Sequence, residues 1–420
     1  MHFLPADGRR GLGAALGVAL LLVACSHRAA PRPRSTESRV EPLVLARPEP
    51  PRDGRLVLAA IFPTVGRHAL SGVQSMNGAR LGVEDLNRAG GIRGRRVVLL
   101  EYPTGSYFLD ARQAAVLAAE AGALAIVGSN SSDLSMAIAE EAEALGLVQV
   151  SNVSTAQELT WNPVTGRDRA FVFRVCSSDV VMGRLLAAFA RDTLGARRAA
   201  VLYEVGRTYS ARLGKSFVER FREADSGRTT AEFFYLALET DFRSQLRAVM
   251  SFRPDVLFLP GSFTDATLIA DQGKALGLTA TLLGADAWSS PLLFQRGGPA
   301  RRAYFLDHCA PPAGFDERYR EAFGQPTQGC RAVLADDAVG AVAAGLLALG
   351  PLHDEDLGER LGATRRRLRD AVSAADFAGL TGRVHFDRMG DRPTRMAVLA
   401  VEPGTNGPPV ARFHGWVGER

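Results

Sequence analysis

Residues 56–101 contain the pattern that indicates the fold class most clearly. It begins with the apolar run LVLAAIF (56–62), continues through the amphipathic segment QSMNGARLGVEDLNRA (74–89) and the turn GGIRG (90–94), and ends with the apolar run VVLLE (97–101). A short apolar run bounded by turn signals is typical of a buried strand, and apolar residues spaced three and four apart are typical of a helix. The stretch therefore predicts a strand, a helix and a second strand.

The same alternation of strand and helix patterns continues along the chain. Further strand-like runs lie at 123–127, 147–151, 199–203, 256–259 and 281–283, and helical patterns lie at 110–120, 136–145, 182–194 and 209–223. Short buried strands alternating with helices predict an α/β fold with parallel sheets covered on both faces. About 365 residues follow residue 55, which is more than one core usually serves, so we expect two lobes.

The first 25 residues have the features of an export signal. Arg9 and Arg10 precede fourteen uncharged residues, 11–24, and Ala24 stands directly before Cys25. As a helix the apolar run would reach about 21 Å, short of the roughly 30 Å hydrocarbon core of a bilayer. This length favours a signal peptide over a membrane span.

A small residue directly before a cysteine resembles the bacterial lipobox, in which the cysteine is diacylated and becomes the new N-terminus. We therefore expect Cys25 to be a lipid anchor and the remaining chain to lie in the periplasm or cell envelope. The alternative is an ordinary signal peptide in which Cys25 is incidental. Neither reading distinguishes the inner from the outer membrane.

Residues 26–55 predict a disordered Pro/Arg-rich linker. They contain six prolines, seven arginines and no Phe, Tyr or Trp, so they cannot bury enough apolar surface to fold. Residues 1–55 hold nine arginines and five acidic residues, and they account for +4 of the formal net charge of +5. The body is therefore nearly neutral, which argues against a nucleic-acid partner.

Polar loops follow two neighbouring strands of the predicted sheet. GSNSS (128–132) follows the run at 123–127, and SNVST (151–155) completes the run at 147–151. Ligands of parallel sheets bind beyond the carboxyl ends of the strands, where hydroxyls and the backbone amides of a helix N-terminus suit an anionic group such as a carboxylate. Alternatively, the hydroxyls of these loops only cap the helices that follow.

No residue pattern indicates catalysis or a metal. The histidines lack the spacing of metal ligands, and GKS (214–216) is not a phosphate-binding loop because Tyr209 stands where that motif needs glycine. Cys309 and Cys330 could form a disulfide, a question the sequence leaves open, and Cys176 is expected to be a buried small residue. We expect no enzyme activity and no cofactor.

Residues 77–96, NGARLGVEDLNRAGGIRGRR, resemble the signature of the leucine/isoleucine/valine-binding family of periplasmic binding proteins. The resemblance continues through IVG (126–128), VSNVSTAQELT (150–160), FVFR (171–174) and PDVLFL (254–259), and it covers nearly all of residues 56–400. It implies a type I periplasmic binding protein fold, with two Rossmann-like lobes joined by three crossovers. Lobe 1 would comprise residues 56–174 plus 310–380, and lobe 2 residues 175–309 plus 381–420.

The resemblance also implies a set of ligand-binding residues. Amino-acid-binding members hold the α-carboxylate with residues that fall on Ser132, Val153 and Thr155 in this chain, with Ser154 between the last two. Their α-ammonium is met by an acidic residue at the position of Asp286. A ligand-contacting tyrosine corresponds to Tyr209.

Departures from the family pattern concern the pocket for the ligand's side chain. Ser71 and Ser262 stand where branched-chain binders carry tyrosines, and Asn152 stands where proline is usual. We include Ser71 and Ser262 among the expected ligand-binding residues. The resemblance therefore implies an amino acid or a related small carboxylate as the ligand, without implying leucine.

The implied function is capture of this ligand between the lobes and its delivery to an ABC permease in the inner membrane. The alternative is a lipoprotein scaffold or sensor of the same fold that regulates a partner in the cell envelope. A pure scaffold need not keep groups for both ends of a zwitterion, so the residues expected to bind an amino acid favour solute binding. The sequence does not indicate the oligomeric state.

Overall fold

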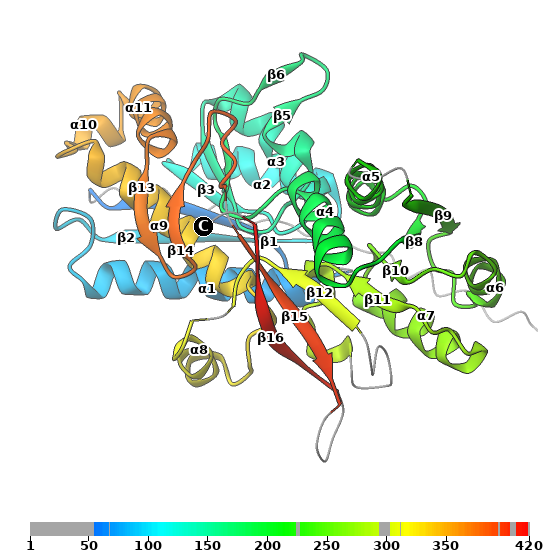
Figure 1. Cartoon of the computed structure of the whole chain (residues 1–420). Helices are drawn as coiled ribbons and strands as arrows, with labels where there is room; N and C mark the ends of the chain where they lie inside the picture. Colours follow the sequence, from blue (N-terminus) through cyan, green and yellow to red (C-terminus); the bar gives the residue numbers. More distant parts are fainter. Residues whose placement is uncertain are drawn as a thin grey trace, which may run out of the picture. The chain divides into compact units, whose positions relative to one another are not determined.

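The structure is a computed structural model, and it describes residues 54–418 except 67, 224–226, 294–302, 311, 394 and 404–408. The expected signal peptide, the lipid-anchor residue Cys25 and all but the last two residues of the expected linker lie outside the described residues. The described chain forms two α/β lobes, each built on its own sheet (Figure 1).

The sheet of the first lobe is wholly parallel, as the sequence predicts. Its strand order is β2-β1-β3-β4-β7. The strands are β1 (Leu56–Pro63), β2 (Val97–Thr104), β3 (Ala125–Gly128), β4 (Val148–Ser151) and β7 (Val172–Arg174). All eight residues of β1 are buried, because this strand is central and both of its faces are covered.

Helices cover both faces of the first sheet. Two apolar clusters lie on opposite sides of β1: Leu58 packs with residues of α1 and α9, while Ile61 packs with residues of α2 and α3. The helices are α1 (Ala69–Arg88), α2 (Phe108–Glu120), α3 (Ser132–Leu145), α8 (Phe315–Phe323), α9 (Arg331–Ala348), α10 (Asp354–Leu357) and α11 (Leu361–Ser373). Helices α1 and α9 pack against each other although they are far apart in the sequence.

The sheet of the second lobe has five parallel strands, as expected, and two further strands at one edge that the sequence did not predict. Its order is β16-β15-β12-β11-β10-β8-β9, and β15 runs antiparallel to both β12 and β16. The strands are β8 (Arg198–Glu204), β9 (Thr229–Tyr235), β10 (Val256–Phe258), β11 (Thr281–Gly284), β12 (Ala303–Asp307), β15 (Met396–Glu402) and β16 (Val410–Val417). Antiparallel strands at one edge are common in large α/β sheets.

Both faces of the second sheet are also covered. Met182 and Phe217 pack from α4 and α5 in one apolar cluster, and Leu246 and Ile269 pack from α6 and α7 in another. The helices are α4 (Asp179–Ala188), the π-helix η2 (Phe189–Thr193), α5 (Thr208–Arg222), α6 (Arg243–Phe252) and α7 (Phe263–Leu276). Short elements complete the described fold: η1 (Gln157–Leu159), β5 (Trp161–Asn162), β6 (Arg167–Asp168), η3 (Asp286–Trp288), η4 (Pro291–Leu293), β13 (Asp376–Gly379) and β14 (Gly382–His385).

The chain passes between the two lobes three times, after β7, after β12 and after β14. The hairpin formed by β13 and β14 packs on α9 of the first lobe, so the last passage begins after residue 385. The expected boundary at residues 380 and 381 falls inside this hairpin. Because β13 and β14 pair with each other, both strands belong to the first lobe, and the boundary lies after residue 385.

A disulfide joins Cys309 to Cys330, which answers the question that the sequence leaves open. Cys309 follows β12 at the start of the second crossover, and Cys330 is the N-cap residue of α9. The bond therefore ties the end of a second-lobe strand to the start of a first-lobe helix. Cys176 is buried and free, as expected, and burial raises the pKa of its thiol to about 12.

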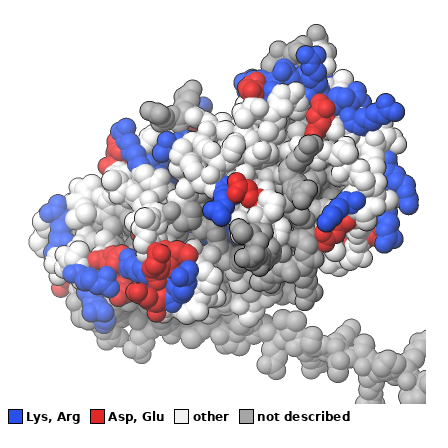
Figure 2. All heavy atoms as spheres, turned by 60° about the horizontal axis from the view of Figure 1, so that its bottom comes forward, with Lys and Arg blue, Asp and Glu red and all other residues white. Residues whose placement is uncertain are grey.

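Acidic and basic side chains are interspersed on the face drawn in Figure 2. On α1, for example, Arg88 pairs with Glu84 and Asp85, and Asp85 also pairs with Arg318 of α8. This face carries no broad basic surface of the kind that nucleic-acid binding requires. Among the described helices, none combines the length and apolar character needed to cross a membrane.

Removing the Cys309–Cys330 bond should lower the stability of the fold. The two cysteines are 21 residues apart, and a bond closing a loop of this size contributes about 3 kcal/mol to the free energy of unfolding. We expect a Cys309→Ser/Cys330→Ser variant to unfold at a lower urea concentration than the parent chain. The parent treated with reductant should unfold at the same urea concentration as the variant. If reductant does not change the urea midpoint of the parent, the disulfide does not stabilise the fold.

Candidate functional site

A cleft of about 350 Å³ lies between the two lobes. Its walls come from the carboxyl ends of strands in both sheets, which is the expected place for a ligand in parallel α/β structures. The lining residues are His68, Ser71, Asn130, Ser131, Ser132, Asp133, Val153, Thr155, Glu204, Val205, Gly206, Arg207, Tyr209, Ala237, Asp286, Ala287 and Arg331. The volume is within the range of small-molecule sites.

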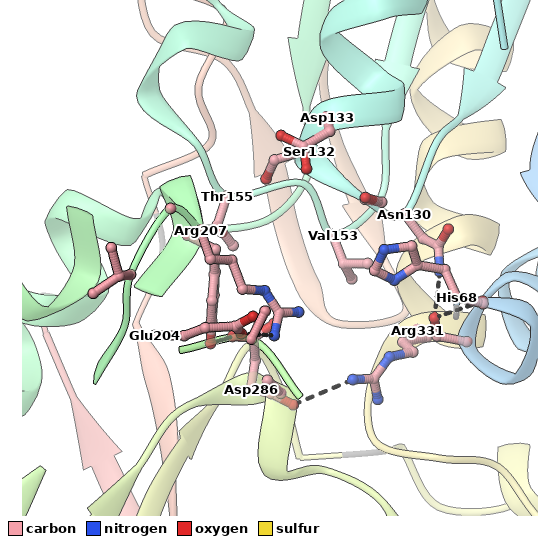
Figure 3. Close-up of a pocket in the computed structure, with 17 residues that line it drawn as sticks. His68, Asn130, Ser132, Asp133, Val153, Thr155, Glu204, Arg207, Asp286 and Arg331 are labelled. Carbon is pink, nitrogen blue, oxygen red and sulfur yellow. Dashed lines mark hydrogen bonds and ion pairs between the residues drawn. The ribbon is translucent and has the colours of Figure 1, made fainter. Parts of the chain in front are cut away.

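The first-lobe wall combines hydroxyls with a helix N-terminus. Ser131 is the N-cap residue of α3, yet its side chain makes no capping hydrogen bond. The Ser131 hydroxyl therefore does not accept a hydrogen bond from the first backbone amides of the helix. Ser132 does not cap the helix either, because its hydroxyl accepts a hydrogen bond from the amide of Ala156 at 3.3 Å. With Thr155 and Val153 alongside, this wall suits a carboxylate (Figure 3).

Ser154, an expected ligand-binding residue, does not line the cleft. It is 1% exposed, and its hydroxyl lies 2.6 Å from that of Ser135 and donates to the carbonyl of Ser129 at 3.1 Å. The hydroxyl of Ser151 donates to the same carbonyl at 2.8 Å. These bonds fasten the loop after β4 to the loop after β3, so Ser154 supports the wall from behind.

The second-lobe wall carries a carboxylate. Asp286 begins η3, directly after β11, and its side chain is 13% exposed. Its Oδ1 accepts a hydrogen bond from the hydroxyl of Tyr209 at 2.8 Å, and its Oδ2 lies 3.6 Å from the imidazole of His308. A carboxylate has acceptor positions beyond these, so Asp286 retains the capacity to bind an ammonium group.

The surroundings of Asp286 favour its charged form. Burial alone would raise the pKa of this carboxyl, but His308 and Arg331 nearby, together with the Tyr209 hydroxyl, hold its pKa below the usual value. The pKa of Tyr209 is raised well above its usual value by burial and by the adjacent carboxylate. The hydrogen bond therefore runs from a neutral phenol to an ionised aspartate.

Ser71 and Ser262 were both expected to bind the ligand, and of these two serines only Ser71 lines the cleft. Its hydroxyl donates to the carbonyl of His68 at 3.1 Å and accepts from the amide nitrogen of Asn130 at 2.6 Å. Ser262 instead is the N-cap residue of α7, where its hydroxyl accepts from the amide of Asp265. A serine just before a helix satisfies an otherwise unpaired amide, which accounts for its place outside the cleft.

Eleven lining residues are absent from the sequence-based expectation, and among them are His68, Asn130, Glu204, Arg207 and Arg331. Asn130 lies in a loop already singled out, Glu204 is the last residue of β8 and Arg207 follows that strand, so the rule about carboxyl ends of strands could have found all three. Arg331 has no such signal, because it reaches the cleft from the start of α9. Its guanidinium donates to the carbonyls of Ser289 at 2.8 Å and Asp286 at 3.3 Å (Figure 3).

Three chain crossings, two covered sheets and a polar cleft between them define a two-lobed protein that binds a small molecule. Residues 56–406 match the family model described as periplasmic binding protein, and the chain belongs to that family. Proteins of this family work outside the cytoplasm, and the homologues are binding proteins of ABC transporters rather than enzymes. Within the described residues no group of three or more His, Cys, Asp or Glu side chains could hold a metal ion.

Individual relatives agree with this assignment. The chain is 24% identical over 246 residues to Leu/Ile/Val-binding protein homolog 3 of Brucella melitensis, a match covering 58% of this chain and 64% of the relative's length. The leucine-binding protein LivK of Thermotoga maritima has a solved structure that matches with a TM-score of 0.72 at 28% identity, covering 86% of this chain and 99% of LivK. A solute-binding protein of R. palustris, solved with benzoate, shares the fold at 19% identity and a TM-score of 0.68, over 87% of this chain and 98% of its own.

A buried carboxyl beside the cleft should make stability depend on pH. Asp179 is the first residue of α4, its amide donates to the carbonyl of Thr155, and neither oxygen of its side chain has a hydrogen-bond partner among the described residues. Burial raises its pKa to about 7, helped by Glu158 and opposed by Arg174. Asp179 therefore binds a proton in the folded state that the unfolded chain releases near pH 4.

The stability that this proton contributes is present below about pH 4 and is lost as the pH rises to about 7. We expect Asp179→Asn to gain about 3 kcal/mol of stability relative to the parent between pH 4.5 and pH 8, at about 1.4 kcal/mol per pKa unit. Urea unfolding at both pH values measures the difference. The exposed Asp168, changed to Asn, is the control, and a difference that is independent of pH would contradict the raised pKa.

Proposed function

We propose that this chain is a lipid-anchored solute-binding protein that captures an amino acid between its lobes and delivers it to an ABC permease. The observation that carries the proposal is the arrangement of the cleft. Hydroxyls and the N-terminus of α3 form one wall, and the ionised Asp286 stands on the other wall. A zwitterion needs donors for its carboxylate and an acceptor for its ammonium, and the two walls offer these separately.

In this proposal Ser132, Val153 and Thr155 surround the carboxylate of the ligand, while Asp286 and Tyr209 bind its ammonium. The two lobes carry opposite ends of the site, so a bound ligand contacts both and stabilises their closed arrangement. No bond is made or broken. The crossovers would act as the hinge, because they are the described segments that join the two sheets.

The cellular setting is also part of the proposal. Cys25 would carry the lipid, residues 26–55 would space the body from the membrane, and an inner-membrane permease would accept the ligand. Membership of the periplasmic binding protein family supports a role outside the cytoplasm. The name of the Brucella melitensis relative supports an amino acid as ligand, although that match spans under two thirds of the relative's length.

A thermal-shift screen of the ligand-stripped protein against single amino acids and small carboxylates tests the proposal. A ligand at one hundred times its Kd adds about 2.7 kcal/mol to the stability of the protein, enough to raise Tm by several degrees. We expect one class of amino acid to shift Tm. Asp286→Ala should weaken its binding by more than about 2 kcal/mol, or roughly 30-fold, because the ammonium then lacks its counter-charge.

Asp286→Asn keeps the shape of the side chain and should lose affinity as well, which separates the missing charge from a cavity. Asp168→Ala removes an exposed carboxylate that does not line the cleft, and we expect it to bind as the parent does. Unchanged affinity in both Asp286 variants would remove the assigned ammonium site. If no compound of the panel shifts the Tm of the parent, the result would favour the scaffold or sensor function instead.

A further inference from the structure

A paired arginine and glutamate form part of the second-lobe wall. Arg207 is the N-cap residue of α5, Glu204 is the last residue of β8, and their side chains meet at 3.2 Å. The side chain of Glu204 is 4% exposed and that of Arg207 is 21% exposed, so the pair is largely withdrawn from water. Figure 3 shows both side chains beside the cleft, on the side of Asp286.

Arg207 keeps donors available for a ligand. A guanidinium has five N–H donors, and among the described residues one hydrogen bond from Arg207 is present, which goes to Glu204. The guanidinium carbon lies 5.9 Å from the centre of the Tyr209 ring, and the Tyr209 hydroxyl binds Asp286. Tyr209 therefore contacts the proposed ammonium site at Asp286 through its hydroxyl and lies beside the guanidinium of Arg207.

The cleft is poorly suited to an aliphatic side chain. Among its described lining residues, Val153 and Val205 are the aliphatic side chains larger than alanine. A branched alkyl group placed against Arg207 and Glu204 would displace the water that hydrogen-bonds to their charged groups. The alkyl group could not replace those hydrogen bonds. The portion of the cleft beyond the ammonium site therefore favours a polar side chain.

Charge balance narrows the choice further. Among the described lining residues, Arg207 and Arg331 stand against Glu204 and Asp286, while Asp133, the remaining acidic residue of the lining, is exposed. A zwitterionic ligand leaves this balance unchanged. A second carboxylate would place a net negative charge in the cleft beside Glu204, whereas a neutral group that both donates and accepts can bind Arg207 and Glu204 together.

We propose that the cleft selects amino acids whose side chain ends in a neutral group with one carbonyl and one N–H donor, a carboxamide or ureido group. Arg207 donates to the carbonyl oxygen of this group, and Glu204 accepts from its nitrogen. The inference rests on the proposed amino-acid capture at Asp286, and it assigns Arg207 and Glu204 as the residues that determine specificity.

Calorimetric titration of the ligand-stripped protein with L-glutamine, L-asparagine, L-citrulline, L-leucine and L-glutamate tests the inference. We expect at least one of the first three to bind ten-fold or more tightly than both leucine and glutamate. Leucine or glutamate binding as tightly as the best of them would overturn the selectivity. This ranking uses the parent protein, so it does not depend on any variant folding.

The variant Arg207→Met keeps the length of the side chain and removes its donors. We expect it to weaken binding of the preferred carboxamide or ureido ligand at least ten-fold and to reduce the preference over leucine, and Glu204→Gln should reduce the preference as well. Arg222→Met, on an exposed part of the same helix, is the matched control and should leave both affinities unchanged. A full preference retained in Arg207→Met would overturn the role of Arg207.

The outcomes separate this inference from the function on which it rests. If amino acids bind and depend on Asp286, but without preference for a carboxamide or ureido side chain, only the specificity is wrong. If only an amino acid outside these five binds, the specificity alone is wrong. If no amino acid of the thermal-shift panel binds, the proposed capture fails, and the specificity fails with it.

Discussion

The buried guanidinium of Arg174 joins a loop of the cleft to two of the crossovers between the lobes. Its side chain has no exposed surface, and it donates to both carboxylate oxygens of Asp391, to the carbonyls of Ser154 and Ala156, and to the hydroxyl of Thr160. Arg174 ends β7 before the first crossover, and Asp391 lies on the third crossover. Because removing one partner of a buried ion pair costs about 3–5 kcal/mol, two crossovers and a loop of the cleft are held in fixed relation.

This arrangement explains how a loop of the ligand site is connected to segments that join the lobes. The loop after β4 is fixed from three directions: Arg174 binds its carbonyls, the Ser154 hydroxyl fastens it to the loop after β3, and the amide of Asp179 donates to Thr155. A ligand contacting this loop therefore contacts a rigid wall. The opposite wall is anchored separately, because Arg331 and the Cys309–Cys330 bond join the start of α9 to the second lobe.

The sequence predicted the strands and helices well wherever periodicity was strong. The strand expected at 56–62 is Leu56–Pro63, and the helix expected at 209–223 is Thr208–Arg222. It did not predict the antiparallel β15 and β16, because a local pattern carries no information about the direction of a pairing partner. The sequence also did not show that Ser154 is buried away from the cleft while Val153 and Thr155 line it. No residue pattern around Arg331 indicates that its side chain extends from the start of α9 into the cleft.

In the proposed function the cleft recognises both charged ends of an amino acid. The most direct measurement is calorimetric titration of the ligand-stripped protein with single L-amino acids, each compared with its N-acetyl and its α-carboxamide derivative. N-acetylation removes the positive charge that Asp286 would bind, and amidation removes the negative charge that the α3 wall would bind. We predict that the free amino acid binds and that both derivatives lose at least ten-fold in affinity. A derivative that binds as tightly as its free amino acid would contradict recognition of that end.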